Sequence, residues 1–425
     1  MGLPKNGRPV DEVLADLDAL GTDDKDFRRG RTFGLVFHAT DELEHALQQA
    51  HDRYLWHNAL SPDAFPSLRR MQTDVVQTAA ELFHGAEIGA AGFMTSGGTE
   101  SILMAVKAAK VRGKRERGVE RPNIVLPMSA HAAFDKGCDY FTIEARRVDV
   151  RADYRADVDA MADAIDDDTV LLVGSAPQYP QGVIDPINDI AALAAERSIS
   201  CHTDACMGGF VLPFLERLGH DIAPWDFRVP GVTSISADLH KYGYVPKGAS
   251  VIIHRSKDLR RDHTFVTDSW LGGVYGSSGI AGTKPGGPIA AAWATLQLLG
   301  EDGFGELSAL AFDARERLVS GVRAIEGLAI VGEPEATMAA ITSGDEARVR
   351  GAGAPGVIDI FAVHDEIGRL GWHLDRQAPP ESIHATCMPV HAEVMDEFLA
   401  DLREAVATVG QARSSDRGTS YAKME

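Results

Sequence analysis

The chain has 425 residues, of which 44% are hydrophobic and 24% are charged. This length and composition exclude a disordered protein and allow one large α/β domain with a smaller domain beside it. Acidic residues outnumber basic ones by 62 to 42, and the formal net charge of -20 argues against nucleic acid or an anionic membrane as the main partner.

Cysteine usage and the lack of long apolar runs indicate where the chain works. The cysteines show no paired spacing typical of a metal site, and the start, MGLPKNGRPVDEV, lacks the apolar core of a signal peptide. No run approaches the roughly 20 apolar residues that a membrane helix needs. We therefore expect a cytoplasmic protein without a metal or a membrane anchor. The cysteines are Cys138, Cys201, Cys206 and Cys387.

Residues 1–57 predict an N-terminal arm followed by a helix. The first 31 residues are polar and acidic, so we expect them to pack on another surface or to stay mobile. Thr40 can cap a helix whose apolar face includes Leu43 and Leu47.

Residues 58–300 predict a large α/β domain with a mainly parallel sheet. A helix follows Pro66, and beyond Gly89 short apolar runs alternate with helical stretches. Such alternation is typical of a sheet that is covered by helices on both faces. Ligands of these sheets bind beyond the carboxyl ends of the strands. The expected strands are residues 92–95, 124–127, 169–175, 199–203, 233–236 and 250–254.

Residues 301–412 predict a smaller C-terminal domain of helices and strands. It begins with a long amphipathic helix, continues through the Gly-rich segment GAGAPGVID and ends with a helix over residues 394–406. The polar tail at residues 413–425 is expected to be disordered.

The segment TSGGTES at residues 95–101 is a candidate phosphate cradle, because it follows an expected strand and opens a helix. Gly97 and Gly98 let the backbone approach a ligand closely, and the N–H groups at a helix start attract a phosphate. The segment has neither the lysine of a P-loop nor the spacing of a dinucleotide-binding turn. An ordinary helix cap formed by Gly98 and Thr99 is the alternative.

The segment CHTDAC at residues 201–206 places Asp204 at the carboxyl end of an expected strand. An ionised carboxylate there can keep a neighbouring pyridine nitrogen protonated, and the small Ala205 leaves room for a flat ring. The alternative is an aspartate that caps the next helix. A metal site formed by Cys201, His202 and Cys206 is disfavoured because adjacent strand residues point to opposite faces.

The segment SISADLHKYG at residues 234–243 contains the candidate nucleophile, Lys241. A lysine flanked by small and aromatic residues loses solvation, which makes its neutral, nucleophilic form more available for reaction with an aldehyde. Lys247 follows six residues later and could exchange roles with it. His131, in the segment SAHAAFDK, could lie flat on the opposite face of a bound ring from Ala205, or it could be a core or capping histidine.

Taken together, these motifs resemble the pyridoxal 5'-phosphate (PLP)-dependent group II decarboxylase superfamily, and within it the sphingosine-1-phosphate lyases. The resemblance runs from about residue 34 to residue 406 through strings such as FMTSGGTESILMAVKAAK, HTDACMGGF, SISADLHKYGYVPKGAS and AGTKPGGPIAAAWA. It implies the aspartate aminotransferase fold, fold type I, with a mainly parallel sheet of the seven-stranded type and a smaller C-terminal α+β domain.

The resemblance also implies roles for individual residues. Lys241 would carry PLP as an imine, Asp204 would pair with the pyridinium nitrogen, His131 would stack on the ring, and His240 would contact the phosphate. The family forms homodimers that share their sites, so Gly282 would reach the phosphate bound to the other chain. The implied cofactor-binding set is Gly97, Gly98, Thr99, His131, Asp204, Ala205, Ser236, His240, Lys241 and Gly282, and its catalytic members are Lys241, Asp204, His131 and His240.

Three polar positions near the expected substrate site depart from the family pattern. Phe37 stands where a tyrosine is usual, and Ser61 and Gln181 stand where histidines are usual. Lys247 is retained as a contact for an anionic group. We therefore expect a small amine substrate with an anionic end rather than a long-chain phosphosphingoid base.

Three functions fit the sequence. The first is a carbon-carbon lyase that cleaves the Cα–Cβ bond of a 2-amino-3-hydroxy compound, with His202, His240 or a cofactor phosphate oxygen as the base for the 3-hydroxyl. The second is an amino-acid decarboxylase that uses the same cofactor site. The third is a PLP-binding protein without lyase activity, which the presence of Lys241, Asp204 and His131 disfavours.

Overall fold

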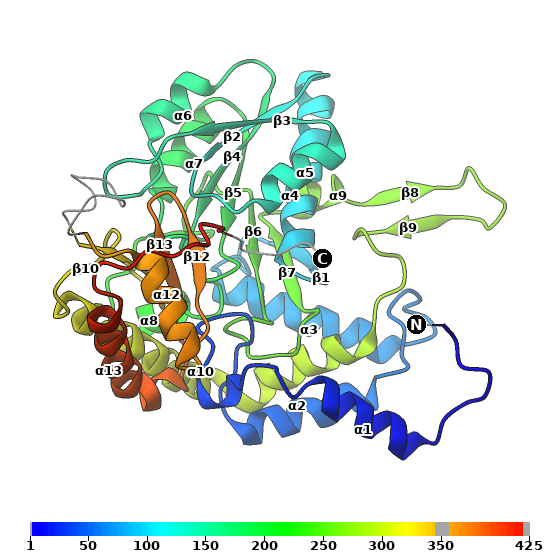
Figure 1. Cartoon of the computed structure of the whole chain (residues 1–425). Helices are drawn as coiled ribbons and strands as arrows, with labels where there is room; N and C mark the ends of the chain where they lie inside the picture. Colours follow the sequence, from blue (N-terminus) through cyan, green and yellow to red (C-terminus); the bar gives the residue numbers. More distant parts are fainter. Residues whose placement is uncertain (1, 345–356, 420–425) are drawn as a thin grey trace.

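The large domain is built on a seven-stranded sheet in the order β1-β7-β6-β5-β4-β2-β3 (Figure 1). The computed structural model describes residues 2–344 and 357–419. Strands β2 to β6 run parallel to one another, whereas β7 is antiparallel to both of its neighbours, β6 and β1. The strands are β1 (Ala91–Thr95), β2 (Asn123–Pro127), β3 (Glu144–Val148), β4 (Thr169–Ser175), β5 (Ser200–Asp204), β6 (Ser234–Ala237) and β7 (Ser250–His254).

Helices cover both faces of this sheet, as the alternating pattern predicted. Apolar side chains of α3, α7, α8 and the first part of α10 pack on one face, and those of α4 and α5 pack on the other. Because both faces are buried, the central strands β2, β4 and β5 contain buried residues at every position. The helices are α3 (Pro66–Leu82), α4 (Gly98–Arg117), α5 (Ala133–Phe141), α6 (Val158–Ala164), α7 (Ile187–Glu196), α8 (Leu212–Arg217), α9 (Lys257–Arg261) and α10 (Gly286–Arg323).

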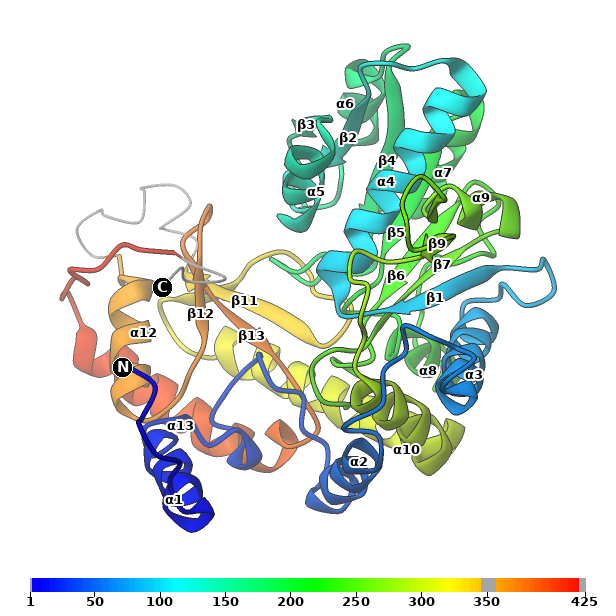
Figure 2. The ribbon, with the colours of Figure 1, turned by 90° about the vertical axis from the view of Figure 1, so that its right-hand side faces the viewer.

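The small domain has its own core beside the large one (Figure 2). A four-stranded antiparallel sheet in the order β10-β11-β13-β12 packs against two helices and the second half of α10. The helix α10 begins in the large domain, and it breaks at Gly300, whose φ of 56° and ψ of -168° are not helical. Beyond this break Phe304, Leu307 and Ala311 still pack in the core of the large domain, so the expected boundary after residue 300 stays a prediction. The elements are β10 (Leu328–Ile330), β11 (Met338–Ser343), α12 (Ile360–Arg369), β12 (Asp375–Gln377), β13 (Ser382–Thr386) and α13 (His391–Val409).

The N-terminal segment joins both domains. Thr40 caps α2 (Asp41–Arg53) by accepting a hydrogen bond from the Leu43 N–H at 3.2 Å, as expected. Phe33 enters the small-domain core, where its ring stacks on His391 at 4.1 Å. The preceding elements are α1 (Val10–Leu20) and the short 3-10 helix η1 (Phe27–Arg29).

Two expectations about the chain ends and linkers need correction. The tail was expected to be disordered from residue 413, yet Ser414 is buried and Arg417 pairs with the buried Asp359 at 2.6 Å. The hairpin formed by β8 (Phe265–Thr267) and β9 (Tyr275–Ser277) projects from the large domain and was not predicted (Figure 1). Residues 351–356 of the Gly-rich segment and residues 420–425 of the tail lie outside the described part of the chain. Within that part, no helix is long and apolar enough to cross a membrane.

Candidate active site

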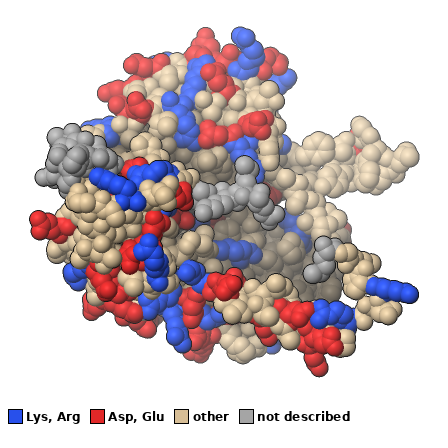
Figure 3. All heavy atoms as spheres, viewed as in Figure 1, with Lys and Arg blue, Asp and Glu red and all other residues tan. Residues whose placement is uncertain are grey.

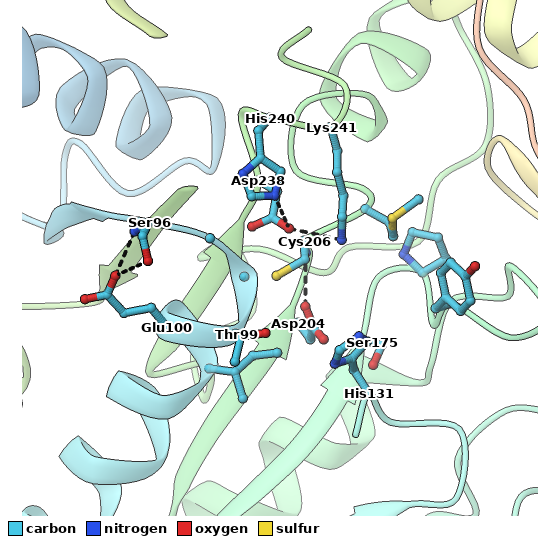
Figure 4. Close-up of a pocket in the computed structure, with 16 residues that line it drawn as sticks. Ser96, Thr99, Glu100, His131, Ser175, Asp204, Cys206, Asp238, His240 and Lys241 are labelled. Carbon is cyan, nitrogen blue, oxygen red and sulfur yellow. Dashed lines mark hydrogen bonds and ion pairs between the residues drawn. The ribbon is translucent and has the colours of Figure 1, made fainter. Parts of the chain in front are cut away.

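A cavity of about 290 Å³ lies at the carboxyl ends of the parallel strands, where ligands of such sheets collect (Figure 4). The loops after β1, β2, β4, β5 and β6 all contribute side chains to it. All three clusters identified in the sequence therefore meet at one place. The expected residues that line it are Gly97, Gly98, Thr99, His131, Asp204, His240 and Lys241.

The turn between β1 and α4 has the form of a phosphate cradle. The first N–H groups of α4 have no partner within the helix, and this end of the helix borders the cavity. A Cβ atom on Gly98 would lie 2.7 Å from Asp238 Oδ2 and 2.8 Å from Cys206 Sγ, so only glycine fits there. Glu100 fixes the turn by accepting hydrogen bonds from the N–H and hydroxyl of Ser96, both at 2.7 Å.

Asp204 lies at the end of β5 and its side chain borders the cavity (Figure 4). Its Oδ1 accepts hydrogen bonds from the Cys206 N–H at 3.0 Å and from the Ser236 hydroxyl at 3.2 Å. Both donors favour the ionised carboxylate, which is the form that a protonated pyridine nitrogen requires. Ser236 is fully buried behind Asp204, and Ala205 is fully buried as well; neither borders the cavity directly.

Lys241 extends into the cavity from the loop after β6, where it meets a carboxylate that sequence analysis did not identify (Figure 4). Its Nζ lies 3.0 Å from Asp238 Oδ2, and His240 Nε2 lies 3.6 Å from the same oxygen. Burial alone would raise the pKa of Asp238, but the Lys241 charge and the His240 contact outweigh it and hold the pKa well below its usual value. Asp238 is therefore a buried anion that balances the charge of Lys241.

His131 lies across the cavity from these groups, in the loop after β2. Its Nδ1 accepts a hydrogen bond from the Ala133 N–H at 3.1 Å, which fixes the orientation of the ring. Burial lowers the pKa of His131, and the opposing charge of Asp204 only partly offsets this. A neutral imidazole in a fixed orientation suits stacking against a flat ring.

The residues expected to bind the substrate do not line this cavity. Lys247 and Phe37 line a neighbouring cavity of about 240 Å³, where the Lys247 Nζ lies 5.1 Å from the centre of the Phe37 ring. Ser61 is exposed, and Gln181 is buried in a loop where its amide oxygen accepts from Gln178 at 2.9 Å. In this chain Gln181 therefore lies outside the cavity, and its role near the substrate stays a prediction.

Gly282 also lies outside the cavity. It follows the β8–β9 hairpin, where a Cβ atom on it would lie 3.3 Å from the hydroxyl of Tyr275. The adjoining segment is tied to the phosphate cradle, because the Ile280 N–H donates to Glu100 Oε1 at 2.8 Å. Gly282 was expected to reach the phosphate bound to the other chain, and this stays a prediction.

Two histidines that were candidates for the base have their nitrogens engaged. His202 is fully buried, and its two ring nitrogens contact the hydroxyls of Ser234 at 2.9 Å and Ser236 at 3.1 Å. His240 accepts a hydrogen bond from the Ala249 N–H on Nδ1, so its neutral form directs a protonated Nε2 towards Asp238. His202 was therefore wrongly considered as a base, since it cannot reach a substrate.

Sequence reasoning also missed several residues that border the cavity. Asp238 was quoted within its motif but was given no role, although its place directly after a strand was a usable signal. Tyr179 borders the cavity from the loop after β4, and its hydroxyl donates to Asp375 Oδ2 of the small domain at 3.1 Å. The other unpredicted residues are Ser96, Glu100, Ile102, Ser175, Pro177, Cys206 and Met207.

These groups fit PLP. The Gly98 cradle can hold a phosphate, Asp204 can hold a protonated ring nitrogen, His131 can cover one face of the ring, and Lys241 can react with the aldehyde. The buried Oδ1 of Asp238 has no hydrogen-bond partner, which indicates a polar ligand nearby. When bound, PLP supplies an aldehyde for exchange with amines and a ring that withdraws electrons from a neighbouring bond.

Comparison with known proteins agrees with this site. Residues 55–341 match the family described as the pyridoxal-dependent decarboxylase conserved domain. The chain is 41% identical to sphingosine-1-phosphate lyase of Drosophila melanogaster, covering 96% of this chain and 73% of that protein. It is 40% identical to sphingosine-1-phosphate lyase 1 of Rattus norvegicus, covering 99% and 72%.

Solved structures show the same relationship. The sphingosine-1-phosphate lyase of Burkholderia pseudomallei superposes with a TM-score of 0.90 at 37% identity, covering 96% of this chain and 92% of that one. A glutamate decarboxylase of Lactobacillus brevis superposes with a TM-score of 0.83 at 21% identity, covering 97% of this chain and 95% of that one, and it shares the fold. The chain therefore belongs to the pyridoxal-dependent decarboxylase family and is a PLP-dependent lyase similar to the sphingosine-1-phosphate lyases.

Proposed function

We propose that the chain cleaves the Cα–Cβ bond of a 2-amino-3-hydroxy compound with an anionic end and releases an aldehyde. The observation that carries this proposal is the convergence of Lys241, Asp204, His131 and the Gly98 cradle on one cavity. Relatives named sphingosine-1-phosphate lyases, at about 40% identity over nearly the whole chain, support cleavage of a carbon-carbon bond.

In this proposal each residue has a defined task. Lys241 would hold PLP through its aldehyde, which can exchange with a substrate amine, and Asp238, 3.0 Å from the Lys241 Nζ, would stabilise the charged form of the lysine. Asp204 would hold the ring nitrogen in its protonated form, and His131 would cover one face of the ring and so fix its orientation. Since His202 and His240 use their nitrogens within the protein, the proton of the 3-hydroxyl leaves to another acceptor, for which a cofactor phosphate oxygen is our candidate.

Lys247 is proposed to bind the anionic end of the substrate. Its Nζ lies 3.0 Å from the carbonyl oxygen of His240, so it is held close to the loop that carries Lys241. The usual tyrosine and histidine of the family are Phe37 and Ser61 here, which removes two polar contacts. Losing two such contacts weakens phosphate binding by roughly 2–5 kcal/mol, so we propose that long-chain phosphosphingoid bases are not the preferred substrates.

We further propose a homodimer whose sites are shared. The helix α1 has no buried residue, and it exposes Leu14 and Leu17 on its surface. The hairpin also exposes apolar side chains, among them Trp270 and Leu271, and Figure 3 shows it as an almost uncharged projection. Exposed apolar surfaces of this kind are typical of protein-protein interfaces. A second chain covering them could bring Gly282, Phe37 or Ser61 to the cavity.

A cytoplasmic location is proposed from the cysteines. Cys138, Cys201, Cys206 and Cys387 are all buried and unpaired, as expected in a reducing compartment.

The test is a substrate screen with purified holoenzyme that measures aldehyde and carbon dioxide separately. We expect aldehyde from phosphorylated amino alcohols or free β-hydroxy amino acids, with a higher kcat/KM than for sphingosine phosphate. Efficient cleavage of sphingosine phosphate would contradict the proposed specificity. Carbon dioxide without aldehyde would identify an amino-acid decarboxylase, and the absence of both products across the screen would favour a PLP-binding protein without lyase activity.

A further inference from the structure

A chain of buried polar groups runs from the middle of the sheet to Asp204. Ser234, His202 and Ser236 lie on the neighbouring strands β5 and β6, and each is at most 4% exposed. The Ser234 hydroxyl lies 2.9 Å from His202 Nδ1, His202 Nε2 lies 3.1 Å from the Ser236 hydroxyl, and that hydroxyl lies 3.2 Å from Asp204 Oδ1. From the sequence, His202 was considered only as a base or a metal ligand, and Ser234 was given no role.

The number of protons fixes the direction of every bond in this chain. An ionised Asp204 cannot donate, so the single hydroxyl proton of Ser236 must point to Asp204. The Ser236 oxygen must then accept a hydrogen bond from the His202 Nε2–H, which leaves His202 Nδ1 to accept a hydrogen bond from the Ser234 hydroxyl. The Cys206 thiol, 3.3 Å from the Ser236 oxygen, fits as a second donor.

Burial is consistent with a neutral histidine in the middle of the chain. Loss of solvation lowers the pKa of His202 to about 4, although the charge of Asp204 opposes this. A neutral His202 has one N–H and one free nitrogen, as the directed chain requires. If Asp204 were protonated, all three bonds could reverse and the proton on His202 would move to Nδ1. The histidine tautomer is therefore coupled to the charge of Asp204.

We propose that Ser234, His202 and Ser236 form a directed hydrogen-bond relay whose function is to hold the charge of Asp204 towards the cofactor ring nitrogen. In this relay His202 and Ser236 are positioning residues, since neither borders the cavity. The proposal rests on the role given to Asp204 above. It predicts that the relay affects the cofactor mainly through the ring nitrogen, because the Ser236 hydroxyl donates to Asp204; the Cys206 thiol, which contacts Ser236 and borders the cavity, is the other link.

The test compares how two probes bind to the protein freed of cofactor. One is PLP, and the other is its 1-deaza analogue, in which a CH group replaces the ring nitrogen. We expect Ser236→Ala to raise the Kd for PLP by about tenfold, because a hydrogen bond to a charged group is lost, and to change the Kd for the analogue by less than about twofold. An equal loss for both probes would show a merely structural role and overturn the relay.

Matched variants complete the experiment. Thr203 lies on the same strand as His202, and its buried hydroxyl has no hydrogen-bond partner. Thr203→Val should therefore leave both Kd values unchanged. His202→Gln retains an N–H donor for Ser236, so it should still bind PLP more tightly than the 1-deaza analogue. His202→Leu has no such donor and should lose this difference between the two Kd values. Equal behaviour of these two variants would contradict the proposed direction. If Asp204→Asn left the preference intact, Asp204 itself would not be the partner of the ring nitrogen, which would refute the role assigned under the proposed function.

Discussion

Lys241, Asp204 and His131 surround one cavity of a single chain, whereas Phe37, Ser61 and Gly282 lie outside it. The first group follows strands of one parallel sheet, so the sheet itself brings their loops together. The second group belongs to the N-terminal segment and to the loop after the hairpin. These residues do not follow strands of the seven-stranded sheet, so the sheet does not bring them to the cavity. Most of the expected cofactor-binding residues therefore meet within one chain, whereas we propose that a second chain completes the site.

Replacing the nucleophile should give the largest effect. Lys241→Ala is expected to lower kcat by at least about a thousandfold, because exchange between the lysine and the substrate amine is lost. Steady-state aldehyde release measures this. Lys110→Ala is a suitable control, because Lys110 lies in the second half of α4, does not line the cavity, and contacts the Phe141 carbonyl oxygen with its Nζ. If Lys241→Ala turned over substrate at nearly the wild-type rate, Lys241 would not be the residue that reacts with the cofactor aldehyde.

Removing the ring partner should give the next largest effect. Asp204→Ala is expected to lower kcat by on the order of a hundredfold, since a hydrogen bond to a charged group contributes roughly 1.5–3 kcal/mol. Kinetics and circular dichroism should be measured together. A normal fold with near wild-type turnover would refute the role of Asp204.

Disrupting the proposed interface should reduce turnover without preventing attachment of the cofactor to Lys241. The double change Leu14→Asp and Leu17→Asp is expected to favour the monomer in light scattering, because charge on an apolar interface opposes association. Turnover should fall by on the order of 30-fold, equivalent to about 2 kcal/mol, while borohydride still attaches the cofactor to Lys241.

The control for this experiment is Leu310→Asp, since Leu310 is 39% exposed on α10, away from α1. It should leave the association state unchanged. A monomeric double variant with full activity would show that the site needs no second chain.

Binding of the anionic end of the substrate can be tested through the charge of Lys247. Loss of hydration, with a smaller contribution from the Lys241 charge, lowers the pKa of Lys247 to about 8. The ammonium is therefore charged below this value and loses its charge as the pH rises through it. We expect KM for an anionic substrate to increase between about pH 7 and pH 9 in the wild type.

Two variants sharpen this test. Lys247→Arg should remove the rise in KM, because a guanidinium keeps its charge, and Lys247→Ala should raise KM about tenfold at neutral pH. A KM that is independent of pH in the wild type and unaffected by Lys247→Ala would assign the anionic end to other residues.

The tail should have the smallest effect, and only on stability. Arg417 pairs with the buried Asp359 at 2.6 Å and also contacts Glu381, but its own side chain is 42% exposed. Solvent weakens such a pair, so Arg417→Ala should lower the free energy of unfolding by about 1 kcal/mol in urea titrations. Arg197→Ala, which removes only a surface pair with Glu196, should have almost no effect.

Sequence patterns predicted the fold where apolar periodicity was strong. Strands β4 and β7 have the expected limits, β1 and β2 begin one residue earlier than expected, and β5 and β6 are each shifted by one residue towards the C-terminus. Strand β3 was missed because it reads EARRV and lies at the sheet edge, where none of its residues is fully buried. The tail was misjudged because its order depends on Arg417 meeting Asp359, a contact between distant parts of the chain.

The site was predictable to the extent that its residues lie in local motifs. Lys241 and the Gly98 turn follow strands and Asp204 is the last residue of one, so sequence motifs and the tendency of ligands to bind beyond the carboxyl ends of strands together locate them. The place of Asp238 directly after β6 was a usable signal, but its pairing with Lys241 is known only from the 3.0 Å contact in the structure. The burial of His202 and Gln181 also depends on neighbours that sequence spacing does not reveal.

The most direct test of the account is to reduce the purified holoenzyme with borohydride and to map the modified peptide by mass spectrometry. The account predicts a yellow protein and a single pyridoxyl group on Lys241, because its nitrogen extends into the cavity beside Asp238. A pyridoxyl group on Lys247, or a protein that binds no PLP, would contradict it.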